Sequence, residues 1–158
     1  GHCAEAAFEV TPFGLELSMP DEARRLQDRG NALAEQGRFV AAIDQFQLAM
    51  QERPSAVLHE SVAQCLLMLD TREGPRQAVD AARAAVQLAP AWADGFLTLG
   101  RACLAAGDPG AAVEAFRRVL KLSPEHPEAP RELSEALHAL EKDHRRLRRA
   151  PATRDDWE

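Results

Sequence analysis

The chain has 158 residues, 46% of them hydrophobic, which is enough to form the core of one domain. Its formal net charge of −6 argues against a general nucleic-acid binder, and because it lacks a run of about 18 apolar residues we expect no membrane span. The spacings of Cys3, Cys65 and Cys103 match no metal or redox motif. We therefore expect Cys65 and Cys103 to pack as small hydrophobes in a reducing compartment, the cytoplasm or alternatively the nucleus.

Residues 1–20 differ in pattern from the rest of the chain. Pro12 and Pro20 forbid a continuous helix there, and no Lys or Arg precedes Arg24. We expect an extended, acidic and apolar arm, Phe8 to Leu17, that docks on a groove of this molecule or of a neighbour; a disordered lead-in is the alternative. Its large apolar residues are Phe8, Val10, Phe13, Leu15 and Leu17.

From Asp21 onward, apolar residues spaced three and four apart predict amphipathic helices in pairs. Asp21 and Ser55 are suited to cap helices at their N-termini, as is Asp108 in the sequence Gly-Asp-Pro. Gly37 and Gly107 are turn signals between paired helices. We expect helices at about 21–37, 38–52, 55–69, 75–88, 91–106, 109–122 and 127–149.

The pattern of the first helix pair returns 70 residues later without a slip. Small, aromatic and proline positions match together, and a degenerate copy of 36 residues lies between the two. The matched pairs are Leu26 and Phe96, Gly30 and Gly100, Leu33 and Cys103, Gly37 and Gly107, Ala42 and Ala112, Phe46 and Phe116, Ala49 and Val119, and Pro54 and Pro124. The degenerate copy has His59, Ala63, Leu66, Ala78, Ala82, Ala85 and Pro90 at the corresponding places.

A helix–turn–helix period of about 34 residues is that of the tetratricopeptide repeat, and the chain resembles this family over roughly residues 22–149. The resemblance implies an all-α, right-handed solenoid. It would have three repeats, at about 23–56, 56–92 and 93–126, a capping helix at 127–149 and a mobile tail at 150–158.

The helix expected at 127–149 has a polar surface and an apolar stripe of Leu133, Leu137 and Leu140, as a helix that closes a solenoid requires. Its end, Lys142 to Arg149, carries five cations against Asp143 alone. Cations are favourable at any helix C-terminus, so a solvated helix end is the simple interpretation. The alternative function for this end is the binding of a nucleic acid or an acidic partner.

In this family the first helix of each pair lines a concave groove, and ligands commonly lie there. The resemblance therefore implies a groove that binds a short peptide or an amphipathic helix of a partner protein. An apolar strip at Leu67, Met68, Leu97 and Leu104 would be rimmed by polar residues. The implied groove residues are Arg24, Gln27, Asn31, Ser61, Gln64, Leu67, Met68, Asp94, Leu97, Thr98, Arg101, Leu104 and Arg131.

One subclass of the family holds the terminal carboxylates of Hsp70 and Hsp90 with a clamp of Lys, Asn, Asn, Lys and Arg. The matching residues here are Gln27, Asn31, Ser61, Asp94 and Thr98, so only the first Asn is retained. Each lost charge-assisted bond typically costs about 1.5–3 kcal/mol. We therefore expect the chain not to bind chaperone tails.

Catalytic or metal-binding constellations are not evident in the sequence. The histidines lack a partner four residues away that could share a metal, and we expect His59 to be packed in the core. The acidic pair Glu132 and Glu135 is expected on a solvent-exposed face. These observations predict a non-enzymatic scaffold or adaptor without cofactors.

Overall fold

Seven α-helices make up the part of the chain that the computed structural model describes, residues 21–149. They are α1 (Glu22–Glu35), α2 (Phe39–Glu52), α3 (Ala56–Met68), α4 (Gly74–Leu88), α5 (Ala93–Ala105), α6 (Pro109–Leu122) and α7 (Ala129–Arg149). The described residues contain no strand, so the predicted all-α fold is confirmed. The arm expected at 1–20 and the tail expected at 150–158 lie outside the described residues.

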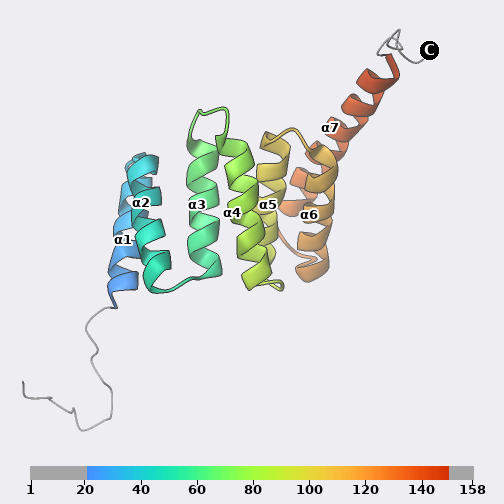
Figure 1. The fold of residues 1–158 in the computed structure, drawn as a ribbon. Coiled ribbons are helices and arrows are strands. Elements are labelled where there is room, and N and C mark those ends of the chain that lie inside the picture. The colour runs from blue at the N-terminus through green and yellow to red at the C-terminus, as the bar shows by residue number, and fades with distance from the viewer. Residues whose placement is uncertain (1–20, 150–158) are drawn as a thin grey trace, which may run out of the picture.

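The helices stand side by side as antiparallel pairs, in sequence order from α1 at one end to α7 at the other (Figure 1). Within the pairs, α1 packs on α2, α3 on α4 and α5 on α6. Contacts of α2 with α3, of α4 with α5 and of α6 with α7 then join neighbouring units. Each unit buries its apolar face against the next one, which is the construction of an α-solenoid.

Side chains cap several helices at the places that the sequence indicated. Asp21 Oδ1 accepts a hydrogen bond from the Ala23 backbone N–H at 3.3 Å, Ser55 Oγ from that of Leu58 at 3.2 Å, and Asp108 Oδ1 from that of Ala111 at 3.0 Å. The fifth and seventh helices begin two residues later than expected, at Ala93 and Ala129. The N-cap of α5 is Trp92, which forms no side-chain cap bond.

Gly37 and Gly107 end the first helices of two pairs in the left-handed conformation, with φ of +74° and +80°. At the first, the Arg38 N–H donates to the Leu33 carbonyl at 2.9 Å, and the Gly37 N–H donates to the Ala34 carbonyl at 2.9 Å. The same two bonds recur around Gly107. This Schellman arrangement satisfies the last helical carbonyls and requires a residue that tolerates positive φ.

An aromatic ring lies directly on a glycine in the first and third pairs. A Cβ at Gly30 would lie 2.5 Å from Phe46 Cε1, and one at Gly100 would lie 2.4 Å from Phe116 Cε1. Both rings are fully buried. The helices of these pairs therefore approach closely at the glycine, which explains why the small and aromatic positions recur together. The middle pair has buried Ala63 and Ala82 at the corresponding places.

Only the first half of α7 packs on the solenoid. Ala129, Glu132 and Ala136 are its buried residues, and Leu133 and Leu140 pack against the core of the neighbouring repeats. From residue 141 onward every described residue of α7 is exposed, and the helix extends beyond the last pair (Figure 1). The sequence predicted the capping helix but not this projection.

Candidate functional site

The first helices of the pairs line the inner side of the solenoid, and α7 continues this row. Although α4 and α6 intervene in the sequence, α3 contacts α5 and α5 contacts α7. Such contacts skip the second helix of a pair, so they identify the side on which the first helices lie close together. The candidate site is the surface along α1, α3, α5 and the start of α7.

The structure divides the predicted groove residues into exposed, half-buried and buried groups. Leu97 and Thr98 were expected on the groove surface, but both are buried. Both side chains lie in the interface between α5 and its neighbouring helices and not on the open groove. The exposed residues are Arg24, Asn31, Gln64, Met68, Asp94 and Arg131; the half-buried ones are Gln27, Ser61, Leu67, Arg101 and Leu104.

A buried carboxylate lies at the centre of the site, at the contact of α3 with α5. Glu60 is only 7% exposed, and its Oε1 accepts a hydrogen bond from the Thr98 hydroxyl at 2.6 Å. The Gln64 side-chain amide also donates to Glu60 Oε1. Buried carboxylates need such donors because burying an unpaired charge is costly. The residues are 38 apart in sequence, so no local pattern indicated the Glu60–Thr98 pair.

The carboxylate also affects a neighbouring thiol. Burial raises the pKa of Cys65, and the negative charge of Glu60 raises it further. Burial likewise raises the pKa of Cys103, with Asp108 adding to the effect. Both cysteines are free and buried, as expected of small core hydrophobes. His59, by contrast, is only half-buried and is not a core residue.

An ion-pair cluster joins α5 to the start of α7. Arg101 Nε donates to Glu132 Oε1 at 2.9 Å and its Nη2 donates to the same oxygen at 2.7 Å; Nη2 also pairs with Glu128. Burial alone would lower the pKa of Arg101, but the bonds to Glu132 and Glu128 outweigh it and raise the pKa. The expectation that Glu132 faces solvent was wrong: Glu132 is buried because it turns toward Arg101.

His126 joins the α6–α7 connection to the start of α5. Its Nδ1 accepts the backbone N–H groups of Glu128 and Ala129, both at 3.3 Å. With Nδ1 acting as acceptor, the ring proton of neutral His126 lies on Nε2 and donates to Asp94 Oδ1 at 3.0 Å. Asp94, at a clamp position of the family, is thereby engaged within the protein.

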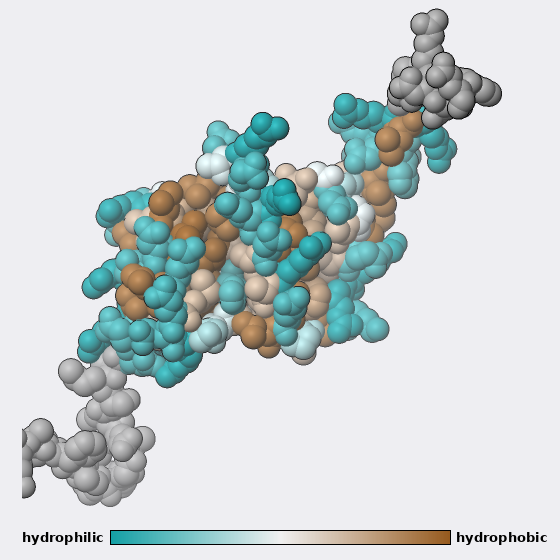
Figure 2. Space-filling view, viewed as in Figure 1, coloured by the Kyte–Doolittle hydropathy of each residue, from teal (hydrophilic) through white to brown (hydrophobic). Residues whose placement is uncertain are grey.

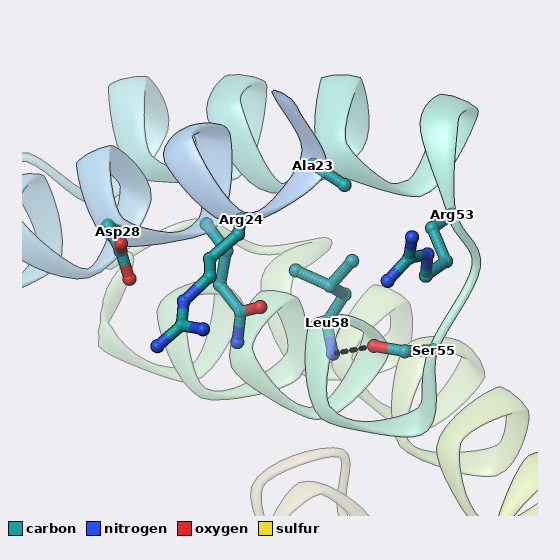
Figure 3. Close-up of a pocket in the computed structure, with 7 residues that line it drawn as sticks. Ala23, Arg24, Asp28, Arg53, Ser55 and Leu58 are labelled. Atoms are coloured by element: carbon teal, nitrogen blue, oxygen red, sulfur yellow. Dashed lines mark hydrogen bonds between the residues drawn. The ribbon is translucent and has the colours of Figure 1, made fainter. Parts of the chain in front are cut away.

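A pocket of about 380 Å³ opens where α1 meets the start of α3. Ala23 and Leu58 are its buried apolar residues, and Leu58 lies between Arg24 and Arg53 in Figure 3. Arg53 is paired with Asp21. Gln27, Asp28 and Ser55 complete the lining. Two of the predicted groove residues, Arg24 and Gln27, thus contribute to this pocket.

Within residues 21–149, no three His, Cys, Asp or Glu side chains are grouped so that they could hold a metal ion. No helix in this described part of the chain has the length and apolar character needed to cross a membrane.

The family model for the tetratricopeptide repeat matches residues 69–127 and 97–145. Among curated proteins, human tetratricopeptide repeat protein 33 is 36% identical over 109 residues, which cover 68% of this chain and 40% of that protein. The Xenopus laevis protein of the same name is 35% identical over 111 residues, which cover 68% of this chain and 41% of that protein. The chain therefore spans about two fifths of the length of these relatives.

Solved structures resemble the chain as well. The first tetratricopeptide repeat domain of Spaghetti (RPAP3), bound to the HSP90 peptide SRMEEVD, is 28% identical with a TM-score of 0.70, covering 75% of this chain and 95% of that one. The first such domain of human RPAP3 is 27% identical with a TM-score of 0.74, and the match covers 80% of this chain and 98% of that one. Together with the repeat pattern and the paired helices, these likenesses show that the chain is a member of the tetratricopeptide repeat family.

Proposed function

We propose that the chain is a non-enzymatic scaffold whose concave groove binds a short peptide or helix of a partner protein, but not the acidic C-terminus of a chaperone. The fold supports a protein or peptide partner, because members of the family are interaction modules and a structural neighbour holds a peptide. The single observation that carries the exclusion of acidic tails is the exposed carboxylate of Asp94, which His126 holds in place.

Thr98 occupies the position where the chaperone-binding subclass has the clamp arginine. Its hydroxyl donates to Glu60 and both side chains are buried, so this position offers no cation to the carboxylate of a ligand. Asp94, at the position of a clamp lysine, is exposed and is bonded to His126. Like charges at close range disfavour binding, so this part of the groove should reject a terminal carboxylate.

The exposed charge of Asp94 favours a ligand that is neutral or basic where it crosses α5. Leu67 and Leu104 are half-buried and Met68 is 64% exposed, which leaves apolar surface for side chains of the ligand. The side-chain amide of Asn31 is exposed and can bond to a peptide backbone. An apolar anchor with an adjacent Lys or Arg would match this combination.

The proposal is tested by selecting binders from a displayed peptide library and measuring their affinity by fluorescence polarisation. We expect apolar and basic peptides, and no measurable binding of SRMEEVD. Met68→Glu in α3 should weaken the selected peptides about tenfold, since it introduces a charge where apolar contact is needed. Leu88→Glu, at a 55% exposed position of α4, is the matched control and should have no effect. Selection of peptides with free acidic C-termini would contradict the proposal.

The basic end of α7, Lys142 to Arg149, is a second candidate surface. All of its residues are exposed, which favours an acidic partner over a role inside the solenoid. A nucleic acid is the other acidic ligand that this charge would attract.

A further inference from the structure

An apolar stripe runs along α7 and is covered by the solenoid only in part. Leu133, Leu137, Leu140, His144 and Leu147 follow one another at spacings of four, three, four and three residues, which keeps them on one face of the helix. Leu133 and Leu140 reach the core, whereas Leu137 is 42% and Leu147 is 72% exposed. In Figure 2, hydrophobic residues of this projection are visible between hydrophilic ones. The stripe therefore continues past the part that the solenoid covers.

The flanks of this stripe are strongly basic. Residues 141–149 hold five cations and two carboxylates, Glu141 and Asp143. Glu141 is paired with Arg145. No carboxylate of residues 21–149 pairs with Lys142, Arg146 or Arg148. This surface is therefore complementary to a partner that has both large apolar side chains and negative charge.

The chain contains a segment of that composition. Residues 5–17 include two Phe, two Leu and a Val, together with Glu5, Glu9 and Glu16, and no cation. The segment precedes α1, which is at the opposite end of the solenoid from α7 (Figure 1). The groove itself is a poorer place for it, because Asp94 exposes a negative charge there.

We propose that residues 5–17 of one copy dock on the exposed part of this stripe, Leu137 to Leu147, and on its basic flanks in a second copy. The two surfaces are different, so the contact is heterologous: each copy offers one arm and one α7 and can bind two neighbours. Unless the rotation closes a ring, such contacts produce assemblies that grow with concentration. This inference is independent of the ligand of the groove.

The test is sedimentation velocity of the full chain over a wide range of concentration, at low and high salt. We expect the mean mass to rise with concentration at low salt and less at high salt, because exposed charges are screened. Reversing Arg146, Arg148 and Arg149 to Glu should weaken self-association about tenfold or more, from the loss of several exposed ion pairs. Reversing Arg72, Arg76 and Arg83, which are exposed on and before α4, is the matched control and should change nothing.

A charge swap separates this contact from general electrostatic effects. Changing Glu5, Glu9 and Glu16 to Lys should abolish self-association. A mixture of this variant with the Arg-to-Glu variant of α7 should restore it, since both contacts between unlike variants have complementary charges. Leu147→Ala should weaken it about tenfold through lost apolar burial.

Several results would overturn the proposal. A chain that stays monomeric at all concentrations at low salt would do so, since an arm folded back within one molecule does not change the mass. Self-association that is insensitive to the reversal in α7 would also refute it. If the same cations instead bind a DNA duplex and the protein does not self-associate, α7 is a nucleic-acid surface.

Discussion

Replacing Gly100 with Ala should destabilise the protein, even though Ala is the better helix former. The new Cβ would lie 2.4 Å from Cε1 and 2.6 Å from Cζ of Phe116. Carbon atoms in contact are normally about 3.5–4.0 Å apart, so either the ring or α5 must move by about 1 Å. The ring is fully buried between helices, and protein interiors are packed too densely for it to shift without cost.

The magnitude follows from two opposing terms. Overpacking a core costs about 1–3 kcal/mol, and the upper end applies because the Cβ is fixed to the helix backbone. Removing a glycine from a helix gains about 0.5–1 kcal/mol. We expect a net loss of about 2 kcal/mol in the free energy of unfolding. Urea denaturation followed by far-UV circular dichroism measures this as a lower midpoint at unchanged slope.

Gly110→Ala is the matched control. A Cβ there would have Asp108 Oδ1 as its nearest neighbour, at 3.6 Å, so the substitution should be neutral or stabilising by up to about 1 kcal/mol. In the double variant Gly100→Ala, Phe116→Ala the clash is absent, and the middle pair shows that Ala63 can face Ala82. The double variant should therefore lose less unfolding free energy than the two single variants together, by more than about 0.5 kcal/mol. Additive costs, or equal effects of the two glycine substitutions, would refute the reasoning.

Thr98→Val should cost about 1–3 kcal/mol of unfolding free energy, because it removes a donor from the buried carboxylate of Glu60; a urea midpoint equal to that of the wild type would contradict this. The thiol of Cys65 should react with Ellman's reagent only after denaturant is added, since burial raises its pKa and blocks access. The bond to Arg145 holds the pKa of Glu141 below its ordinary value. Glu141 therefore keeps its negative charge, and with it the ion pair to Arg145, down to a lower pH than an unpaired glutamate would. Arg145→Ala should raise the pKa, as measured by an NMR titration of the carboxyl carbon; an unchanged titration would show that the pair does not persist in solution.

Local chemistry explains why the sequence predicted the helices and their order. The caps at Asp21, Ser55 and Asp108 act within three residues, and the turns at Gly37 and Gly107 depend on one backbone conformation. These interactions need no knowledge of the rest of the chain. Thr71, whose Oγ1 accepts the Gly74 N–H at 3.0 Å, is a local cap of the same kind that the sequence analysis missed.

The candidate site was predictable only in part. The repeat register indicated which helices line the groove, because equal positions in successive repeats occupy equal places in a solenoid. It did not indicate that Thr98 and Leu97 are buried, nor that Glu132 turns inward to Arg101. A polar residue on the groove side of a helix has the same sequence pattern whether it meets solvent or a neighbouring helix.

The sequence by itself therefore determined the seven helices, their pairing and the family, through periodicity, caps and turns. Only the tertiary structure decided which charges remain available to a ligand. The hydrogen bond of Glu60 and the ion pairs of Arg101 join residues 38 and 31 positions apart, on helices that meet only when the repeats stack. Whether such a group is buried and paired depends on how closely α3, α5 and α7 approach, and that distance is set by the packing of all the repeats together.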